Sequence, residues 1–122
     1  MNEMSPKVQN QIAQFQQLQQ QLQSVLNQKF QMESKLREME NTMEELERAP
    51  KENAVYKNAG SLLIQVKDRD TVVEELEEEK ETLEVRLKSL NRQEKHMREK
   101  YEGLQEQLSQ ALGGIGGGQS PA

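Results

Sequence analysis

Apolar residues recur every three to four positions over two long stretches of the chain. The first stretch runs from Pro6 to about residue 48 and contains no glycine, and no proline after its first position. An apolar repeat of 3.5 residues keeps one stripe of a helix facing a partner helix. The pattern predicts a coiled-coil helix whose stripe consists of Val8, Phe15, Leu18, Leu22, Val25, Met32, Leu36, Met39, Met43 and Leu46.

Local signals set the ends of this first helix. Ser5 offers a hydroxyl cap, and Pro6 suits the first helical position because its missing N–H needs no partner there. Pro50 ends the helix because a proline disfavours the helical conformation at the residue before it. We therefore expect one helix over about residues 6–48, interrupted in its apolar stripe by Gln11 and Lys29.

The second stretch predicts a helix over about residues 70–112. Thr71 and Glu74 form a T-x-x-E capping box at its start, and Gly113 is a common signal for its end. Gly103 lies inside the helix, where it costs about 1 kcal/mol relative to alanine. The stripe is apolar at every d position and mixed at the a positions, and it consists of Val73, Leu76, Lys80, Leu83, Leu87, Leu90, Glu94, Met97, Tyr101, Leu104, Leu108 and Ala111.

The two stripes match when the helices are antiparallel. If Leu46 faces Val73, every a position meets a d position, as in Met43 with Leu76, Leu36 with Leu83, Leu22 with Met97, Leu18 with Tyr101 and Phe15 with Leu104. Glu94 then opposes Val25, and Lys29 lies one turn away. Lys29 and Glu94 either pair diagonally or extend separately to solvent, and both alternatives make them features that fix the register.

A different pattern separates the two helices. Residues 54–58 and 62–66 form two runs with β-type composition joined through Asn and Gly, which predicts a β-hairpin over about residues 54–67. An isolated two-stranded hairpin is marginal in water and has two unpaired edges. We infer that it joins hairpins of other chains in a shared sheet or barrel, through a hairpin surface that comprises Val55, Tyr56, Leu62, Leu63, Ile64 and Val66.

The predicted fold is therefore mainly α. It is an antiparallel two-helix coiled-coil hairpin with a central β-hairpin that assembles into an oligomeric β-barrel. We expect a single domain over residues 1–112 and a flexible glycine-rich segment over residues 113–122.

The amino-acid composition argues against catalytic, metal and cofactor sites. The 122 residues include no Cys and one His, with 33% apolar and 30% charged residues and a net charge of −5. We therefore expect no catalytic residue, no metal site and no cofactor. An acidic chain is a poor ligand for nucleic acid, and no apolar stretch is long enough for a membrane span. The single His96 falls on the solvent side of the second helix. The chain is expected to act through assembly.

The free ends of the two helices carry further apolar residues. End turns fray, and an exposed apolar end favours contact with another apolar chain. For Phe15 and Leu104 the alternative is that they only close the coiled coil, whereas Ile12 and Leu112 lie beside the stripe and are expected to be exposed. We call this set the tip surface, and it comprises Val8, Ile12, Phe15, Leu104, Leu108 and Leu112.

The segment from Val55 to Ile64, placed between two long heptad helices, resembles the β-class subunit of prefoldin. The most specific residues are Tyr56, Gly60 and the pair Leu62 and Leu63, and the resemblance covers about residues 8–112. One hairpin rather than two favours the β class over the α class. The glycine-rich segment lies outside the shared pattern.

The resemblance implies a cytoplasmic hexamer of two prefoldin alpha subunits and four beta subunits, joined through a β-barrel. It also implies ATP-independent capture of unfolded client proteins at the tip surface and their delivery to a group II chaperonin. The hairpin surface would then hold the assembly contacts. The competing interpretation is a passive structural coiled coil, a spacer or scaffold that remains a monomer or a simple dimer.

Overall fold

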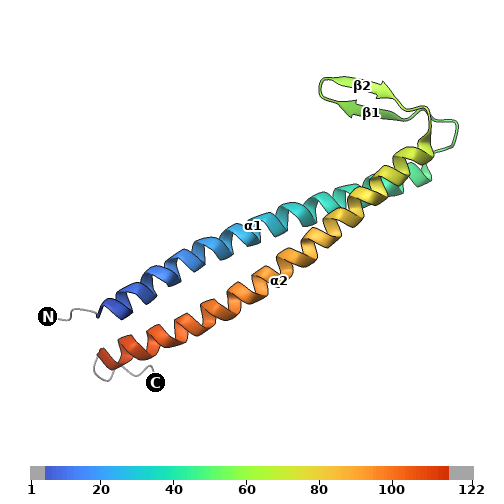
Figure 1. Cartoon of the computed structure of the whole chain (residues 1–122). Helices are drawn as coiled ribbons and strands as arrows, with labels where there is room; N and C mark the ends of the chain where they lie inside the picture. Colours follow the sequence, from blue (N-terminus) through green and yellow to red (C-terminus); the bar gives the residue numbers. More distant parts are fainter. Residues whose placement is uncertain (1–4, 116–122) are drawn as a thin grey trace. The chain divides into compact units, whose positions relative to one another are not determined.

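The computed structural model describes residues 5–115 of the chain. Four elements follow in order: α1 (Pro6–Arg48), β1 (Tyr56–Ala59), β2 (Leu62–Gln65) and α2 (Arg69–Ile115) (Figure 1). The prediction of two long helices around a β-hairpin is confirmed. The chain divides into two compact units, which we call the terminal unit (residues up to Lys29 and from Ser89) and the hairpin unit (Phe30–Lys88).

Both ends of α1 lie where the sequence predicts them. At its start, Oγ of Ser5 accepts a hydrogen bond from the backbone N–H of Val8 at 3.2 Å, so Ser5 is the N-cap. At its end, the helix stops at Arg48, before Pro50. The guanidinium of Arg69 donates to the carbonyl oxygens of Ala49 at 3.1 Å and Pro50 at 3.4 Å. This side chain from α2 therefore holds the two residues that follow α1, and the Pro50 carbonyl also accepts the N–H of Asn53 at 3.0 Å.

α2 begins within one residue of the predicted start, but its capping residue differs from the prediction. Oδ1 of Asp68 accepts the backbone N–H of Asp70 at 3.0 Å, and Oδ2 accepts the hydroxyl of Thr71 at 3.1 Å. Asp68 is therefore the N-cap, and the predicted capping box of Thr71 and Glu74 is wrong. The physical reason is that the Asp68 carboxylate is a strong cap, so that α2 begins at Arg69, two residues before Thr71, and the Thr71 hydroxyl donates to that carboxylate.

The end of α2 also differs, because the helix continues through Gly113 to Ile115. A glycine ends a helix when it adopts a left-handed conformation, and among the described residues Gly60 is the only one with positive φ. The predicted end at residue 112 is thus wrong. The rest of the segment that we expected to be flexible, residues 116–122, lies outside the described residues.

The terminal unit is held by an apolar seam between α1 and α2. Its buried side chains are 6–7% exposed and all occupy predicted stripe positions: Val8, Leu18, Val25, Leu90 and Leu108. The rings of Phe15 and Tyr101 stack across the seam with their centroids 4.6 Å apart and an interplanar angle of 25°. An offset aromatic pair adds about 0.5–1.5 kcal/mol to the burial of its area.

Polar contacts across the same seam confirm the register to within one helical turn. The amide of Gln11 donates to Oε1 of Gln107 at 3.1 Å, and the amide of Gln19 donates to the hydroxyl of Tyr101 at 3.3 Å. The predicted partners of Gln11 and Gln19 are residues 108 and 100. Each observed partner is therefore a neighbour of the predicted one.

The two charges within the seam of the terminal unit pair with each other. Nζ of Lys29 lies 2.9 Å from Oε1 of Glu94, and Nη2 of Arg98 lies 2.6 Å from Oε2. The Glu94 side chain is 14% exposed and that of Lys29 is 28% exposed. The hydrogen bond from Lys29 lowers the pKa of Glu94 below its ordinary value, with Arg98 adding to the effect and burial opposing it. The diagonal pairing is confirmed over the alternative of two unpaired charges.

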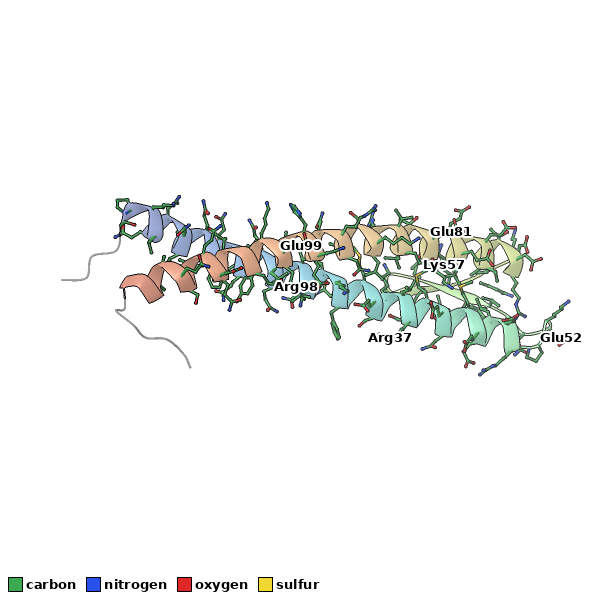
Figure 2. The ribbon with its side chains drawn as sticks, turned by 90° about the horizontal axis from the view of Figure 1, so that it is seen from below. Arg37, Glu52, Lys57, Glu81, Arg98 and Glu99 are labelled. Atoms are coloured by element: carbon green, nitrogen blue, oxygen red, sulfur yellow. The ribbon has the colours of Figure 1, made fainter. Side chains whose placement is uncertain are left out.

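Within the hairpin unit, Met39 and Leu83 are the buried apolar side chains, at 6% and 9% exposed. Nζ of Lys80 lies 3.8 Å from Oε1 of Glu40, another contact within one residue of the predicted register. Arg37 and Glu81 are exposed, and Figure 2 shows charged side chains of this kind on the outer surface of the helices.

The β-hairpin has a two-residue turn. The strands are antiparallel, with Tyr56 opposite Gln65 and Ala59 opposite Leu62, and the N–H of Val66 continues the ladder to the carbonyl of Val55 at 2.8 Å. Gly60, the first turn residue, has a φ of 64°, whereas Ser61 does not have positive φ. This is the φ pattern of a type II′ turn, which requires glycine at the first position and matches the twist of the strands.

Candidate functional site

The hairpin surface is exposed on the isolated chain. The exposed fractions of Tyr56, Leu62, Leu63 and Ile64 are 57%, 63%, 70% and 51%. Val55 and Val66, at the base of the hairpin, are half-buried. Burying a large apolar side chain is worth about 1.5–3 kcal/mol relative to exposing it. Four such side chains on eight strand residues therefore favour burial against another molecule.

The strand pairing distributes these residues over two faces. Side chains alternate along a strand and directly opposed residues share a face. Ala59 and Leu62 therefore share one face with Ile64, and the other face carries Tyr56 and Leu63. Apolar side chains stand on both faces. Within the chain, neither face is buried.

The hairpin contacts α2 through an ion pair. Nζ of Lys57 lies 3.7 Å from Oε2 of Glu75, and both side chains are more than half exposed. An exposed ion pair of this kind is worth at most about 1 kcal/mol. The two strands form a two-stranded sheet, so each has one edge that is not paired within the described residues. The hairpin thus has both its edges and its apolar faces available to a partner.

The tip surface is partly accessible. Val8 and Leu108 are each 7% exposed and pack within the seam of the terminal unit. Phe15 and Leu104 are half-buried, and so is Ile12, for which we predicted exposure. Leu112 is 42% exposed, in line with its predicted position beside the stripe. The accessible apolar area of this surface therefore belongs to four of its six residues.

Two exposed apolar residues were not identified from the sequence. Phe30 on α1 and Val85 on α2 are 67% and 65% exposed. They occupy heptad positions b and f, which face away from the seam, so their place in the repeat was the signal that could have found them. Both belong to the hairpin unit. They supply useful reference positions, because they are apolar and exposed but lie outside both predicted surfaces.

The described residues form no metal site, and few of their titratable groups are perturbed. They contain no group of three or more side chains arranged to bind a metal ion. Glu94 is the titratable group among them with a resolved pKa shift, and its ion pair with Lys29 accounts for that shift. His96 is exposed, as predicted. Over the part of the chain that the structure describes, neither helix is apolar enough over a sufficient length to cross a membrane.

Comparisons with known proteins agree with one another. A family model described as prefoldin subunit matches residues 9–115. The prefoldin subunit beta of Archaeoglobus fulgidus is 47% identical over 112 residues, which cover 92% of this chain and 96% of that protein. The prefoldin subunit beta of Methanococcoides burtonii is 48% identical over 112 residues, which cover 92% and 95%.

A solved structure is also similar. The crystal structure of the prefoldin beta subunit from Thermococcus strain KS-1 superposes with a TM-score of 0.80 at 41% sequence identity. The match covers 92% of this chain and 97% of that chain.

Proposed function

The chain belongs to the prefoldin family as a β-class chaperone subunit, and from this premise we propose that its tip surface captures unfolded polypeptides without ATP. We propose further that capture takes place in a cytoplasmic hexamer of two alpha and four beta subunits, which passes the client to a group II chaperonin. The observation that carries this proposal is the exposure of the hairpin surface, which a chain acting alone would leave in water.

The hairpin surface provides the assembly contact. Both strands have an unpaired edge, and alternate side chains such as Leu62 and Ile64 present one apolar face. Strand addition at such edges supplies main-chain hydrogen bonds, and burial of the faces supplies most of the free energy. The passive spacer is less consistent with this surface, because a hairpin that only closed a turn would have no need for exposed Leu and Ile.

The tip surface provides the client contact. Ile12, Phe15, Leu104 and Leu112 contribute accessible apolar area, and the buried Val8 and Leu108 hold the helix ends together beneath them. One such patch binds weakly. Several patches that engage one client together raise the avidity by about 10²–10⁴, so assembly and capture depend on each other.

Removing the tip surface tests the capture step. A chain without residues 1–15 and 104–122 keeps the hairpin surface, so we expect it to form a complex of unchanged stoichiometry with its alpha partner. We expect the complex to lose its ability to suppress aggregation of a chemically denatured protein, measured by light scattering after dilution from denaturant.

Point variants provide the matched comparison. Replacing Ile12 and Leu112 by serine removes two accessible apolar residues of the tip surface, whereas replacing Phe30 and Val85 by serine removes two exposed apolar residues elsewhere. We expect the first pair to raise the concentration needed for protection at least several-fold and the second pair to leave it unchanged. Equal effects of the two pairs would contradict a specific client surface.

A further inference from the structure

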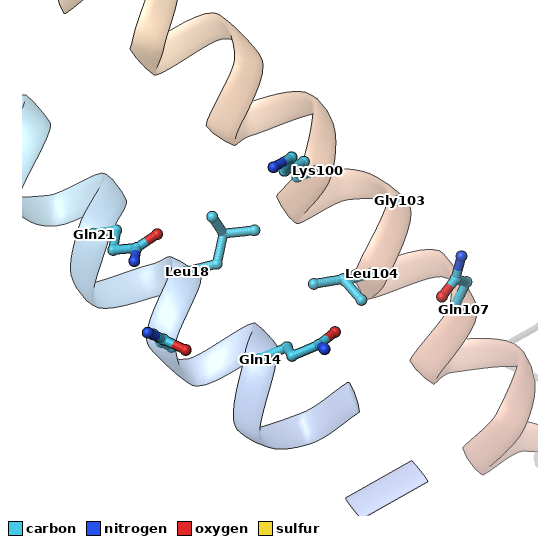
Figure 3. Close-up of a pocket in the computed structure, with 8 residues that line it drawn as sticks. Gln14, Leu18, Gln21, Lys100, Gly103, Leu104 and Gln107 are labelled. Carbon is cyan, nitrogen blue, oxygen red and sulfur yellow. The ribbon is translucent and has the colours of Figure 1, made fainter. Parts of the chain in front are cut away.

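A groove of about 540 Å³ lies between α1 and α2 in the terminal unit. Leu18 from α1 and Leu104 from α2 extend into the space between the helices and form its apolar floor (Figure 3). Its walls carry four glutamines, with Lys100 and Gly103 on the α2 side. A second, separate groove in the same unit shares Gln107 and reaches Val8.

Gly103 keeps the groove open. A Cβ atom built at this residue would meet no atom within 4 Å, so no described residue fills the space beside it. Glycine in a helix interior costs about 1 kcal/mol relative to alanine, and the helix would tolerate many side chains at this position. The absence of a side chain therefore has no packing reason within the described residues.

Three glutamines of the groove have side-chain amides that find no partner within residues 5–115. Gln11 and Gln19 use their amides across the seam, whereas those of Gln14, Gln17 and Gln21 make no hydrogen bond to another described residue. A carboxamide has two donors and an acceptor, the same groups as a peptide bond. The three residues follow one face of α1 over about 10 Å, the length of roughly three residues of extended chain.

The charge of the groove selects among polypeptide ligands. Lys100 is its one ionisable lining residue, and it has no acidic lining residue. Basic residues also outnumber acidic ones over residues 5–29 and 89–113, which contain six Lys or Arg and four Glu. The hairpin unit, by contrast, contains ten basic and sixteen acidic residues. A segment that carries acidic residues is therefore favoured here over a basic one.

We propose that this groove binds an extended, apolar and acidic segment of an unfolded polypeptide. One apolar side chain lies beside Gly103 on Leu18 and Leu104, the main chain pairs with the glutamine amides, and an acidic side chain reaches Lys100. The inference rests on the proposed function and adds main-chain recognition to it. Hydrogen bonds to the main chain are independent of client sequence, so this mode suits a chaperone with many clients.

Filling the groove provides the test. The probe is a fluorescent, unstructured 12-residue peptide of alternating Leu and Ser with two Glu at each end, and its affinity for the assembled complex is measured by anisotropy. Gly103→Leu is expected to weaken binding about tenfold or more. Gly103→Ala, which removes the glycine without filling the groove, and Ser109→Leu, which adds the same side chain at an exposed position of α2 outside the groove, are expected to leave it unchanged.

Two altered peptides test the chemistry of recognition. N-methylation of alternate peptide bonds removes main-chain donors, and Lys in place of the terminal Glu residues reverses the charge. Both are expected to bind several-fold more weakly than the parent peptide, and equal binding of either would overturn the corresponding contact.

The outcome also separates this inference from the proposed function. If the wild-type complex protects clients and binds the peptide but Gly103→Leu binds it equally well, the groove assignment is overturned and the proposed function stands. If the wild-type complex protects no client, both are overturned.

Discussion

Lys29 and Glu94 place opposite charges in a seam whose most buried side chains in the terminal unit are all apolar. Partly buried charges lose hydration, and the loss is offset only while each has its partner. We expect Glu94→Gln to lower the free energy of unfolding by about 1–2 kcal/mol at neutral pH, because the Lys29 ammonium is left in the seam without a counter-charge. Urea denaturation at fixed protein concentration measures the change. Arg98→Ala, which removes the more exposed partner, should cost less than about 1 kcal/mol.

The same pair predicts an acid dependence. The pKa of Glu94 is lowered in the folded chain, first by the hydrogen bond from Lys29, so the folded state binds this proton more weakly than the unfolded chain. The stabilisation is fully present above the ordinary value of 4.5 and is lost as the pH falls through the lowered pKa. We expect the difference in unfolding free energy between wild type and Glu94→Gln to shrink below about pH 4.5. A difference that stayed constant down to pH 2 would contradict this role of the ion pair.

At the scale of the elements, Asp68 determines where α2 begins. We expect Asp68→Ala to lower the melting temperature of the chain, with a loss of about 1 kcal/mol, because the N–H of Asp70 loses its acceptor. Circular dichroism at a fixed chain concentration follows the transition. Glu74→Ala is the matched control: it also removes one acidic residue near the start of α2, but it breaks neither hydrogen bond of the Asp68 cap. A larger loss for Glu74→Ala would favour the capping box of Thr71 and Glu74.

The sequence predicts the elements better than it predicts their ends. The seam follows from the heptad repeat because the repeat is sustained over many turns, and contacts such as Gln11 with Gln107 fall within one residue of the predicted register. Asp68 and Thr71 are both good caps, and only the backbone path selects between them. Gly113 would end the helix only in a left-handed conformation, which depends on its surroundings rather than on its identity.

For the candidate surfaces, the sequence predicts the exposure of some residues and not of others. The exposure of Leu62 and Ile64 is predictable, because a two-residue turn and alternating strands determine which residues share a face. The half-burial of Ile12 is not, because it depends on how side chains of the facing helix fill the space beside the seam. The groove at Gly103 is hidden from the sequence for a similar reason. A glycine in a helix costs the same whether or not the space beside it is filled.

At the scale of the whole molecule, the hairpin surface is expected to control assembly. Replacing Leu62 and Ile64 by Asp places charges on the face that we propose is buried between subunits. Dissociation of the complex is therefore expected, with retention of the helical signal in circular dichroism. Val85→Asp is the control, since Val85 is as exposed as Leu62 but lies on the outer side of α2. A complex that survived the double replacement would argue against the shared barrel.

The most direct test of the account is the mass of the assembly in solution. Sedimentation or native mass spectrometry of this 14.1 kDa chain, alone and mixed with an alpha-class partner, reports whether the hairpin joins molecules. The account predicts that the mixture forms one discrete complex containing four copies of this chain and two of the partner. A chain that sediments as the same small species with and without the partner would contradict it.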